Sequence, residues 1–181
     1  MNYLHVSLTG LRGRHHPALA NIITTTQVQK SRIHLKMLTG DYLTYEIRAE
    51  QSGGSPHCRC CLPSSSSSPS SSPAENLEHI LSKCSAYSDV RNRMYIQYKN
   101  LCSNSRTKLE FDNVFNNDKL FCQFVLDPSS FNLIERIHLC DPVLNDLFQL
   151  SRDYCHAVNS ARMRILKSKQ AETQLKTNHT M

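Results

Sequence analysis

Apolar residues recur at spacings of three and four along much of this 181-residue chain, a pattern typical of amphipathic helices. The longest such run starts after Pro142. It comprises Val143, Leu144, Leu147, Phe148, Leu150, Tyr154, Val158, Ala161 and Ile165. This run predicts a long C-terminal amphipathic helix, and it supports a mainly α fold for the whole chain.

Shorter helical patterns precede this run and divide the chain into regions. Residues 15–56 predict a helical lead-in, with a first helix that stops at Gly40 and a second short element before the turn "QSGGSP". Residues 57–101 combine a cysteine-rich stretch with two helical segments. Residues 102–166 begin as an Asn- and Asp-rich loop, continue through a short apolar segment that stops at Asp127-Pro128, and end in the long helix. We therefore expect one small helical domain.

Three segments lack helical periodicity. Residues 1–14 form an N-terminal segment, and residues 167–181 lose the apolar face, which predicts a basic flexible tail. Residues 62–74 hold eight serines and three prolines, a composition that cannot bury apolar surface. We expect this tract to be a flexible loop, which the fold tolerates because the entropic cost of closing a loop grows slowly with its length.

Composition favours an intracellular protein. Mean hydropathy is −0.44 and Trp is absent, which indicates a soluble chain with a thin core. No apolar run approaches the ~20 residues needed to span a bilayer, and the N-terminus does not resemble a secretory signal. We therefore expect a cytoplasmic or nuclear location and no membrane partner. A net charge of +6, concentrated near both ends, is compatible with phosphate contacts, although solvated helix faces explain it equally simply.

A reducing location makes metal binding a better explanation than disulfides for clustered cysteines. Cys58 and Cys61 have the C-x2-C spacing of a zinc knuckle, and after seventeen intervening residues His79 and Cys84 supply an H-x4-C pair. The sequence thus predicts one structural Zn²⁺ ion held by these four residues. The remaining distant cysteines stand beside apolar residues, which favours core packing: Cys102, Cys122, Cys140 and Cys155.

Two features complicate this ligand assignment. Five residues along an α-helix correspond to a rotation of ~500°, so His79 and Cys84 reach one ion only if the helix breaks between Leu81 and Ser85. In addition, His57 and Cys60 are alternative ligands. Ligands separated by one residue rarely reach the same ion, which favours Cys58 and Cys61, but spacing alone leaves a chance cluster open.

The flanking residues resemble the C-terminal zinc-binding region of non-LTR (LINE-type) retrotransposon polyproteins, which follows the reverse transcriptase domain. The similar stretches are "HLKMLTGDYLTYEIRAEQSGGSPHCRCC" and "ENLEHILSKCSAYSDVRNRM", and the likeness extends over roughly residues 15–166. The matching positions are Leu38, Thr39, Gly40, Tyr42, Cys58, Cys61, Glu75, Leu77, Glu78, His79, Leu81, Cys84 and Arg91. The chain departs from the family in its longer serine-rich spacer and in Cys60.

This resemblance implies a non-catalytic, zinc-stabilised module that helps to hold RNA or DNA. The Tyr-x-Asp-Asp motif of a polymerase is absent, and the acidic residues do not form the cluster of a two-metal nuclease. Four protein ligands would also leave no open position for catalysis on the zinc ion. Candidate nucleic-acid contacts are Arg91, Arg93, Arg162 and Arg164. Two alternatives stay open, namely a zinc-structured protein-interaction domain and an inert remnant of a decayed element.

Overall fold

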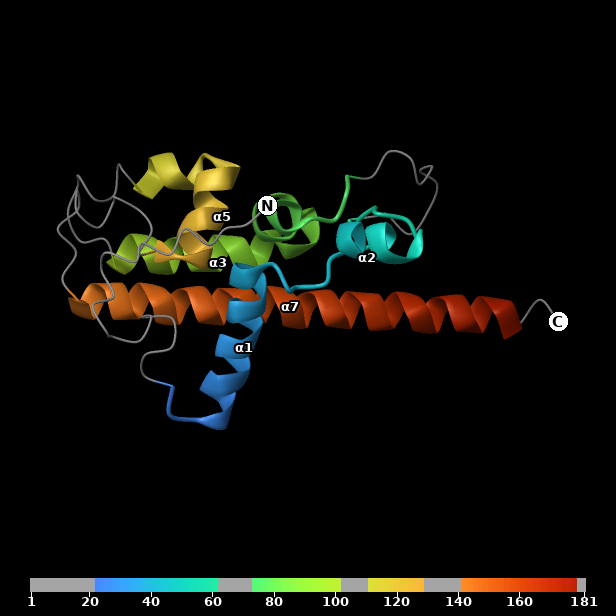
Figure 1. The fold of residues 1–181 in the computed structure, drawn as a ribbon, viewed down its shortest axis with the longest axis horizontal. Coiled ribbons are helices and arrows are strands. Elements are labelled where there is room, and N and C mark those ends of the chain that lie inside the picture. The colour runs from blue at the N-terminus through green and yellow to red at the C-terminus, as the bar shows by residue number, and fades with distance from the viewer. Residues whose placement is uncertain (1–21, 62–72, 102–110, 129–140, 179–181) are drawn as a thin grey trace.

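The long helix α7, Asp141–Asn178, is the spine of the computed structural model (Figure 1). At ~1.5 Å per residue its length is ~57 Å. Helix α1, Thr25–Thr39, crosses it, and α3, Ser88–Leu101, runs along it (Figure 1). Helix α5, Asp118–Leu126, contacts both α1 and α7. The structure describes residues 22–61, 73–101, 111–128 and 141–178. The expected N-terminal segment and the serine tract up to residue 72 lie outside these ranges.

Helices α1, Thr25–Thr39, and α2, Tyr45–Ser52, form the lead-in. Thr24 begins α1 with a capping box, in which its side chain accepts from the Gln27 N–H and the Gln27 side chain accepts from the Thr24 N–H. Gly40 ends α1 in the left-handed conformation with φ of 83°, which favours glycine. The predicted stop at Gly40 is therefore confirmed, and the short second element is helix α2.

Residues 77–101 form a chain of helical segments of different types. A π-helical turn, η3, spans His79–Lys83, and a 3₁₀ turn, η4, spans Ser85–Tyr87. Helix α3, Ser88–Leu101, follows directly. A short helical segment over residues 111–115 then precedes α5, Asp118–Leu126, which ends before Asp127 as the sequence predicts.

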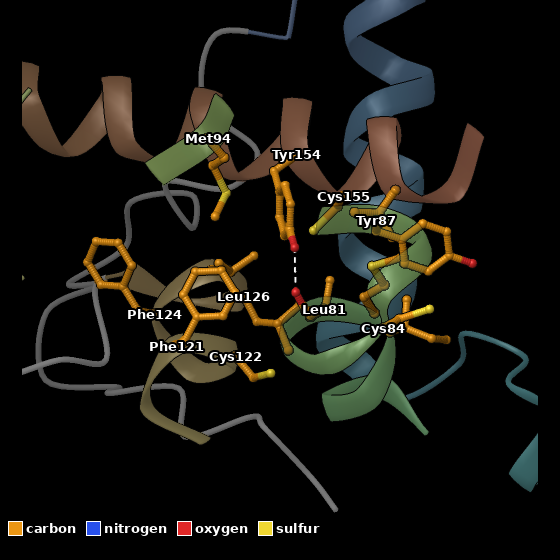
Figure 2. Close-up of a cluster of buried hydrophobic side chains, with 14 of the residues drawn as sticks. Leu81, Cys84, Tyr87, Met94, Phe121, Cys122, Phe124, Leu126, Tyr154 and Cys155 are labelled. Atoms are coloured by element: carbon orange, nitrogen blue, oxygen red, sulfur yellow. Dashed lines mark hydrogen bonds between the residues drawn. The ribbon is translucent and has the colours of Figure 1, made fainter. Parts of the chain in front are cut away.

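Aromatic side chains fill the space between α3, the 111–115 segment and α5. We call Tyr95, Tyr98, Phe111, Phe115, Phe121 and Phe124 the aromatic cluster. Its ring centroids lie 4.4 to 6.1 Å apart, within the range of favourable aromatic pairs. Figure 2 shows Phe121 and Phe124 of α5 lying on one side of the buried core, with Tyr154 of α7 above them.

The structure confirms a mainly α fold with a long C-terminal helix. The described residues contain no β-strand, only an isolated bridge between His57 and Ala74. The predicted burial of Cys122 and Cys155 is confirmed, while Cys102 and Cys140 lie outside the described ranges.

The prediction of a flexible tail from residue 167 is wrong, since α7 continues to Asn178. Residues 167–176 consist largely of Lys, Gln, Ala, Glu and Leu, which have high intrinsic helix propensity and extend the helix without an apolar face. Loss of apolar periodicity marked the end of the buried stripe rather than the end of the helix.

Candidate metal centre

Two backbone hydrogen bonds close the loop that separates the C-x2-C knuckle from the rest of the site. The Cys58 N–H donates to the Pro73 carbonyl at 2.9 Å, and the Glu75 N–H donates to the Pro56 carbonyl at 2.8 Å. The chain segments on either side of the serine tract therefore run antiparallel at His57 and Ala74. This pairing brings Cys58 beside Glu75 and fixes the knuckle against the helical segments that follow.

The π-helical turn η3 brings His79 and Cys84 together. In an α-helix, side chains five residues apart point ~140° away from each other. A π-turn closes instead on a hydrogen bond between residues five apart, and here the Cys84 N–H donates to the His79 carbonyl at 2.7 Å. Cys84 then leaves the helical conformation, with ψ of 118°. The predicted break before Ser85 is confirmed. The residue spacing did not predict the π-turn that precedes this break.

Side chains from α7, from α3, from the preceding residue Asn76 and from the turn itself bind backbone groups of this unusual turn. The Tyr154 hydroxyl of α7 donates to the Leu81 carbonyl (Figure 2). The Ser82 hydroxyl donates to the Glu78 carbonyl at 2.7 Å, and the His79 N–H donates to the Asn76 side chain at 2.8 Å. Arg91 of α3 donates to the Cys84 carbonyl at 3.3 Å. Because the distant side chains of Tyr154 and Arg91 donate to backbone carbonyls of this turn, tertiary structure helps to hold the π-turn in place.

The structure places the ligand atoms of Cys58, Cys61, His79 and Cys84 within 4.8 Å of one another, a group that could hold a metal ion. We call these residues the four-ligand cluster. The Cys61 sulfur lies 3.0 Å from the Cys84 sulfur and 3.2 Å from His79 Nε2, and the Cys58 and Cys84 sulfurs are 3.9 Å apart. Tetrahedral ligands at metal distances of ~2.3 Å for sulfur and ~2.0 Å for nitrogen would be ~3.6 to 3.8 Å apart. The predicted set thus converges on one point, with Cys61 closer to Cys84 and His79 than the tetrahedral separations require.

Burial and donor type both suit a structural metal. Cys58 and Cys84 are fully buried, His79 is 5% exposed and Cys61 is half-buried. Three thiols and one imidazole form a soft donor set of the kind that binds thiophilic transition metals. Four converging ligands also fill a tetrahedral shell, so the arrangement leaves no vacant position for a substrate.

Cys60 is not in the four-ligand cluster but in a second group of potential metal ligands. Its sulfur, that of Cys58 and a Glu75 carboxylate oxygen lie within 4.8 Å of one another. A hydrogen bond to Cys58 and burial raise the pKa of Cys60, whose side chain also contacts Tyr87. His57 is in neither group of potential ligands found among the described residues. The geometry therefore favours Cys61 over Cys60 as the partner of His79 and Cys84.

Hydrogen bonding distinguishes Cys58 from its neighbours. Side-chain hydrogen bonds from Cys60 and Cys84 lower the pKa of Cys58. The same contact with Cys58, together with burial, raises the pKa of Cys84. Because a metal ligand must be a thiolate, these contacts between the cysteines favour the presence of a thiolate within the cluster.

A buried ion pair lies beside the four-ligand cluster, and sequence reasoning missed it. Glu75 is fully buried, and one of its carboxylate oxygens accepts from Arg162 at 2.5 Å and from the Tyr45 N–H at 3.0 Å. Its other oxygen lies 3.7 Å from the Cys58 sulfur. Burial raises the pKa of Glu75, and the Arg162 guanidinium opposes that shift. This pair connects a potential metal ligand directly to α7.

The placement of Arg162 was readable from the pattern of α7. Ser151, Cys155, Val158 and Arg162 follow one another at spacings of four, three and four, so Arg162 continues a buried stripe. Its guanidinium also lies over the rings of Tyr42 and Tyr45, at 5.6 and 5.5 Å from their centroids. An arginine at a buried position of a helix indicates an internal ion pair. Arg162 was predicted instead to contact nucleic acid at the surface.

The four arginines predicted to contact nucleic acid occupy different environments. Arg162 is only 4% exposed and is committed to Glu75, so it is not presented at the surface. Arg91 is half-buried and binds the carbonyls around the π-turn. Arg93 on α3 and Arg164 on α7 are exposed. The structure therefore gives Arg91 and Arg162 internal partners and leaves Arg93 and Arg164 at the surface.

Fold and site together define a mainly helical protein with a buried Cys₃His cluster that could hold a metal ion. Comparisons with protein-family models, with curated proteins and with solved structures find no match to this chain. Among the described residues, no helix combines the length and the apolar composition needed to cross a membrane.

Proposed function

We propose that the four-ligand cluster binds one Zn²⁺ ion whose role is structural. The convergence of three sulfurs and His79 Nε2 at separations of 3.0 to 3.9 Å carries this proposal. Zinc is the ion that tetrahedral Cys₃His sets most commonly hold in proteins. With zinc bound, Cys58 and Cys61 would fix the knuckle, and His79 and Cys84 would fix the π-turn.

We further propose that the chain is a non-catalytic module derived from a retrotransposon reverse transcriptase polyprotein, and that it contributes to RNA or DNA binding. The positions that carry the sequence resemblance support this origin, because they surround the cluster. Leu38, Tyr42 and Leu81 are buried, Glu75 contacts Cys58, and Arg91 binds the Cys84 carbonyl. The net charge of +6 favours contact with a polyanion.

Metal analysis of the purified chain tests the first proposal. We expect one zinc ion per chain, retained in a Cys60→Ser variant and lost in a Cys58→Ser variant. Both substitutions replace one sulfur in the same knuckle, so they control for each other. A chain that carries no stoichiometric zinc, and whose circular dichroism does not change with chelator, would refute the zinc proposal and support an inert remnant.

Binding to labelled RNA and DNA across a range of salt concentrations tests the second proposal. We expect affinity to fall as salt rises, because phosphate contacts release bound counterions. A zinc-loaded chain that binds neither polymer, or whose binding does not respond to salt, would refute the nucleic-acid role and leave a zinc-structured protein-interaction domain as the better explanation.

A further inference from the structure

A groove of about 640 Å³ lies between the metal knuckle and the distal half of α7. Arg59 contributes from the knuckle and Tyr45 from the start of α2, and α7 supplies Lys169, Gln170 and Thr173 among others. Among the described residues that line it, none is acidic. The groove therefore combines two cations and amide and hydroxyl groups with the apolar surfaces of Tyr45 and Leu166, a composition that is compatible with an anionic ligand.

The knuckle determines where Arg59 lies. Arg59 stands between Cys58 and Cys61, so a metal held by these two cysteines would fix its backbone. Its guanidinium lies 4.8 Å from the centroid of the Tyr45 ring, and its carbonyl accepts from Lys169 Nζ at 2.7 Å. This bond holds Lys169 beside the knuckle. The two cations are thus drawn together across the groove.

The other wall of the groove is also tied to the metal centre. Leu166, Lys169, Gln170 and Thr173 are spaced by three, one and three residues, which places them on one face of α7. Arg162 precedes Leu166 by one turn on that face and is held by Glu75 beside Cys58. Metal binding at the knuckle would therefore position both walls.

We infer that this groove binds the phosphate backbone of a single nucleic-acid strand and that the metal centre organises it. The inference rests on the proposed function and specifies its surface. Arg59 and Lys169 would contact phosphates, and the Gln170 amide would donate to sugar or phosphate oxygens. The Thr173 hydroxyl already donates to the Lys169 carbonyl at 2.9 Å. Single-strand binding proteins use positively charged grooves of this kind to follow the backbone. The surface differs from the arginines that the sequence suggested, since neither Arg59 nor Lys169 was among them.

The test measures the affinity of the zinc-loaded full chain for a fluorescein-labelled, mixed-sequence RNA oligonucleotide by anisotropy at several salt concentrations. We expect Lys169→Ala to weaken binding by about fivefold at moderate salt and to reduce the slope of log affinity against log salt by about 0.7, the value for one phosphate contact on a single strand. Arg59→Ala should have a similar effect, and Arg32→Ala on α1, which is also exposed, should have none.

A matched pair of charge insertions guards against misfolding of the alanine variants. Gln170→Glu places a negative charge at the groove, and Ser168→Glu places one on the opposite side of the same helix turn. We expect only Gln170→Glu to weaken binding, with zinc content unchanged in both. Equal effects of the two substitutions, or unaltered binding by Lys169→Ala and Gln170→Glu, would overturn the groove assignment.

Further outcomes locate any failure. If the zinc-loaded wild-type chain binds no RNA, the proposed function and this inference both fail. If it binds RNA while the groove variants bind equally well, only the groove assignment fails. Tighter binding of duplex DNA, or displacement of the RNA by poly-glutamate of equal charge, would refute the assignment to a single strand. Unchanged RNA binding after chelation would refute the organising role of the metal.

Discussion

The four-ligand cluster and the aromatic cluster are buried in the same small protein but are held together by different physics. Around the four-ligand cluster the buried groups include ionisable ones: Cys58, Cys84 and Glu75 are inaccessible, and His79 nearly so. In the aromatic cluster the buried groups are rings, with Phe111 at its centre in contact with Tyr95, Tyr98, Phe115 and Phe124. Apolar burial stabilises the second region without help, whereas the first requires a partner for its buried polar groups.

Tyr154 of α7 joins the two regions. Its ring centroid lies 6.1 Å from that of Phe121, and its hydroxyl donates to the Leu81 carbonyl in the π-turn (Figure 2). One side chain thus uses its apolar body in the aromatic region and its polar tip at the metal region. The comparison predicts that each region can be disturbed separately, and that residues on α7 transmit the disturbance between them.

The largest expected effect comes from removing a metal ligand. We expect Cys84→Ser to abolish stoichiometric zinc binding and to remove protection from hydrogen exchange in residues 57–61 and 79–87. Structural zinc contributes apparent binding free energies on the order of 10 kcal/mol in small modules, so this end of the protein should not stay ordered without it.

Cys122→Ser is the matched control, because Cys122 is also a fully buried cysteine but is outside the four-ligand cluster. It should retain one zinc ion per chain. Protection in α3 and α5 should persist in Cys84→Ser if the aromatic cluster is independent of the metal. Loss of protection throughout the chain would show instead that the two regions form one cooperative unit.

The second prediction concerns a substitution in the aromatic cluster instead of the metal region. Phe111 is 1% exposed, so Phe111→Ala removes a fully buried ring from the aromatic cluster and should lower the free energy of unfolding by about 3–5 kcal/mol. Urea denaturation of the zinc-loaded chain measures this loss. Zinc affinity, measured by competition with a chromophoric chelator, should change by less than about twofold if the regions act separately. A parallel loss of zinc affinity would contradict the comparison.

The third prediction concerns the ion pair that links the metal region to α7. Arg162→Leu leaves the Glu75 charge buried without its partner and should destabilise the zinc-loaded chain by about 3 kcal/mol in urea denaturation. We also expect zinc affinity to fall about tenfold, since groups that surround metal ligands typically affect affinity on this scale. The position is therefore predicted to affect both regions.

The Arg162→Leu and Glu75→Gln double variant separates charge from packing. Because it removes both charges, it should recover part of the stability that Arg162→Leu loses. Arg164→Leu, two residues along α7 at an exposed position, serves as the control for the leucine substitution and should leave stability and zinc affinity unchanged. A double variant as unstable as the sum of its single variants would show that the ion pair does not connect the two residues energetically.

The same contrast explains which features the sequence could predict. Helix periodicity and the cap at Gly40 depend on neighbouring residues, and they correctly placed α1, α2 and the start of α7. The predicted four ligands are likewise brought together. The π-turn was beyond reach because it depends on Tyr154 and Arg91, which lie 73 residues and 10 residues from Leu81 along the chain. The buried stripe of α7 indicates that Arg162 is internal, but only the tertiary fold identifies its partner, Glu75, which lies 87 residues away along the chain.

The smallest predicted effect is a pH response at the edge of the aromatic cluster. A hydrogen bond from the Tyr95 hydroxyl at 2.7 Å, together with Lys99, lowers the pKa of Asp112. A carboxyl group with a lowered pKa in the folded state stabilises the protein above its unfolded pKa of ~4, and this contribution disappears as pH falls through the folded value. We expect Asp112→Asn to be less stable than wild type near pH 7, and the difference in stability to shrink as pH falls below ~4.

Urea denaturation of both chains at each pH measures this difference in stability. Acid release of the metal cancels in the difference because it is common to both chains. A difference that stays constant with pH would mean that Asp112 acts through its hydrogen bonds alone and that charge contributes nothing to the aromatic cluster.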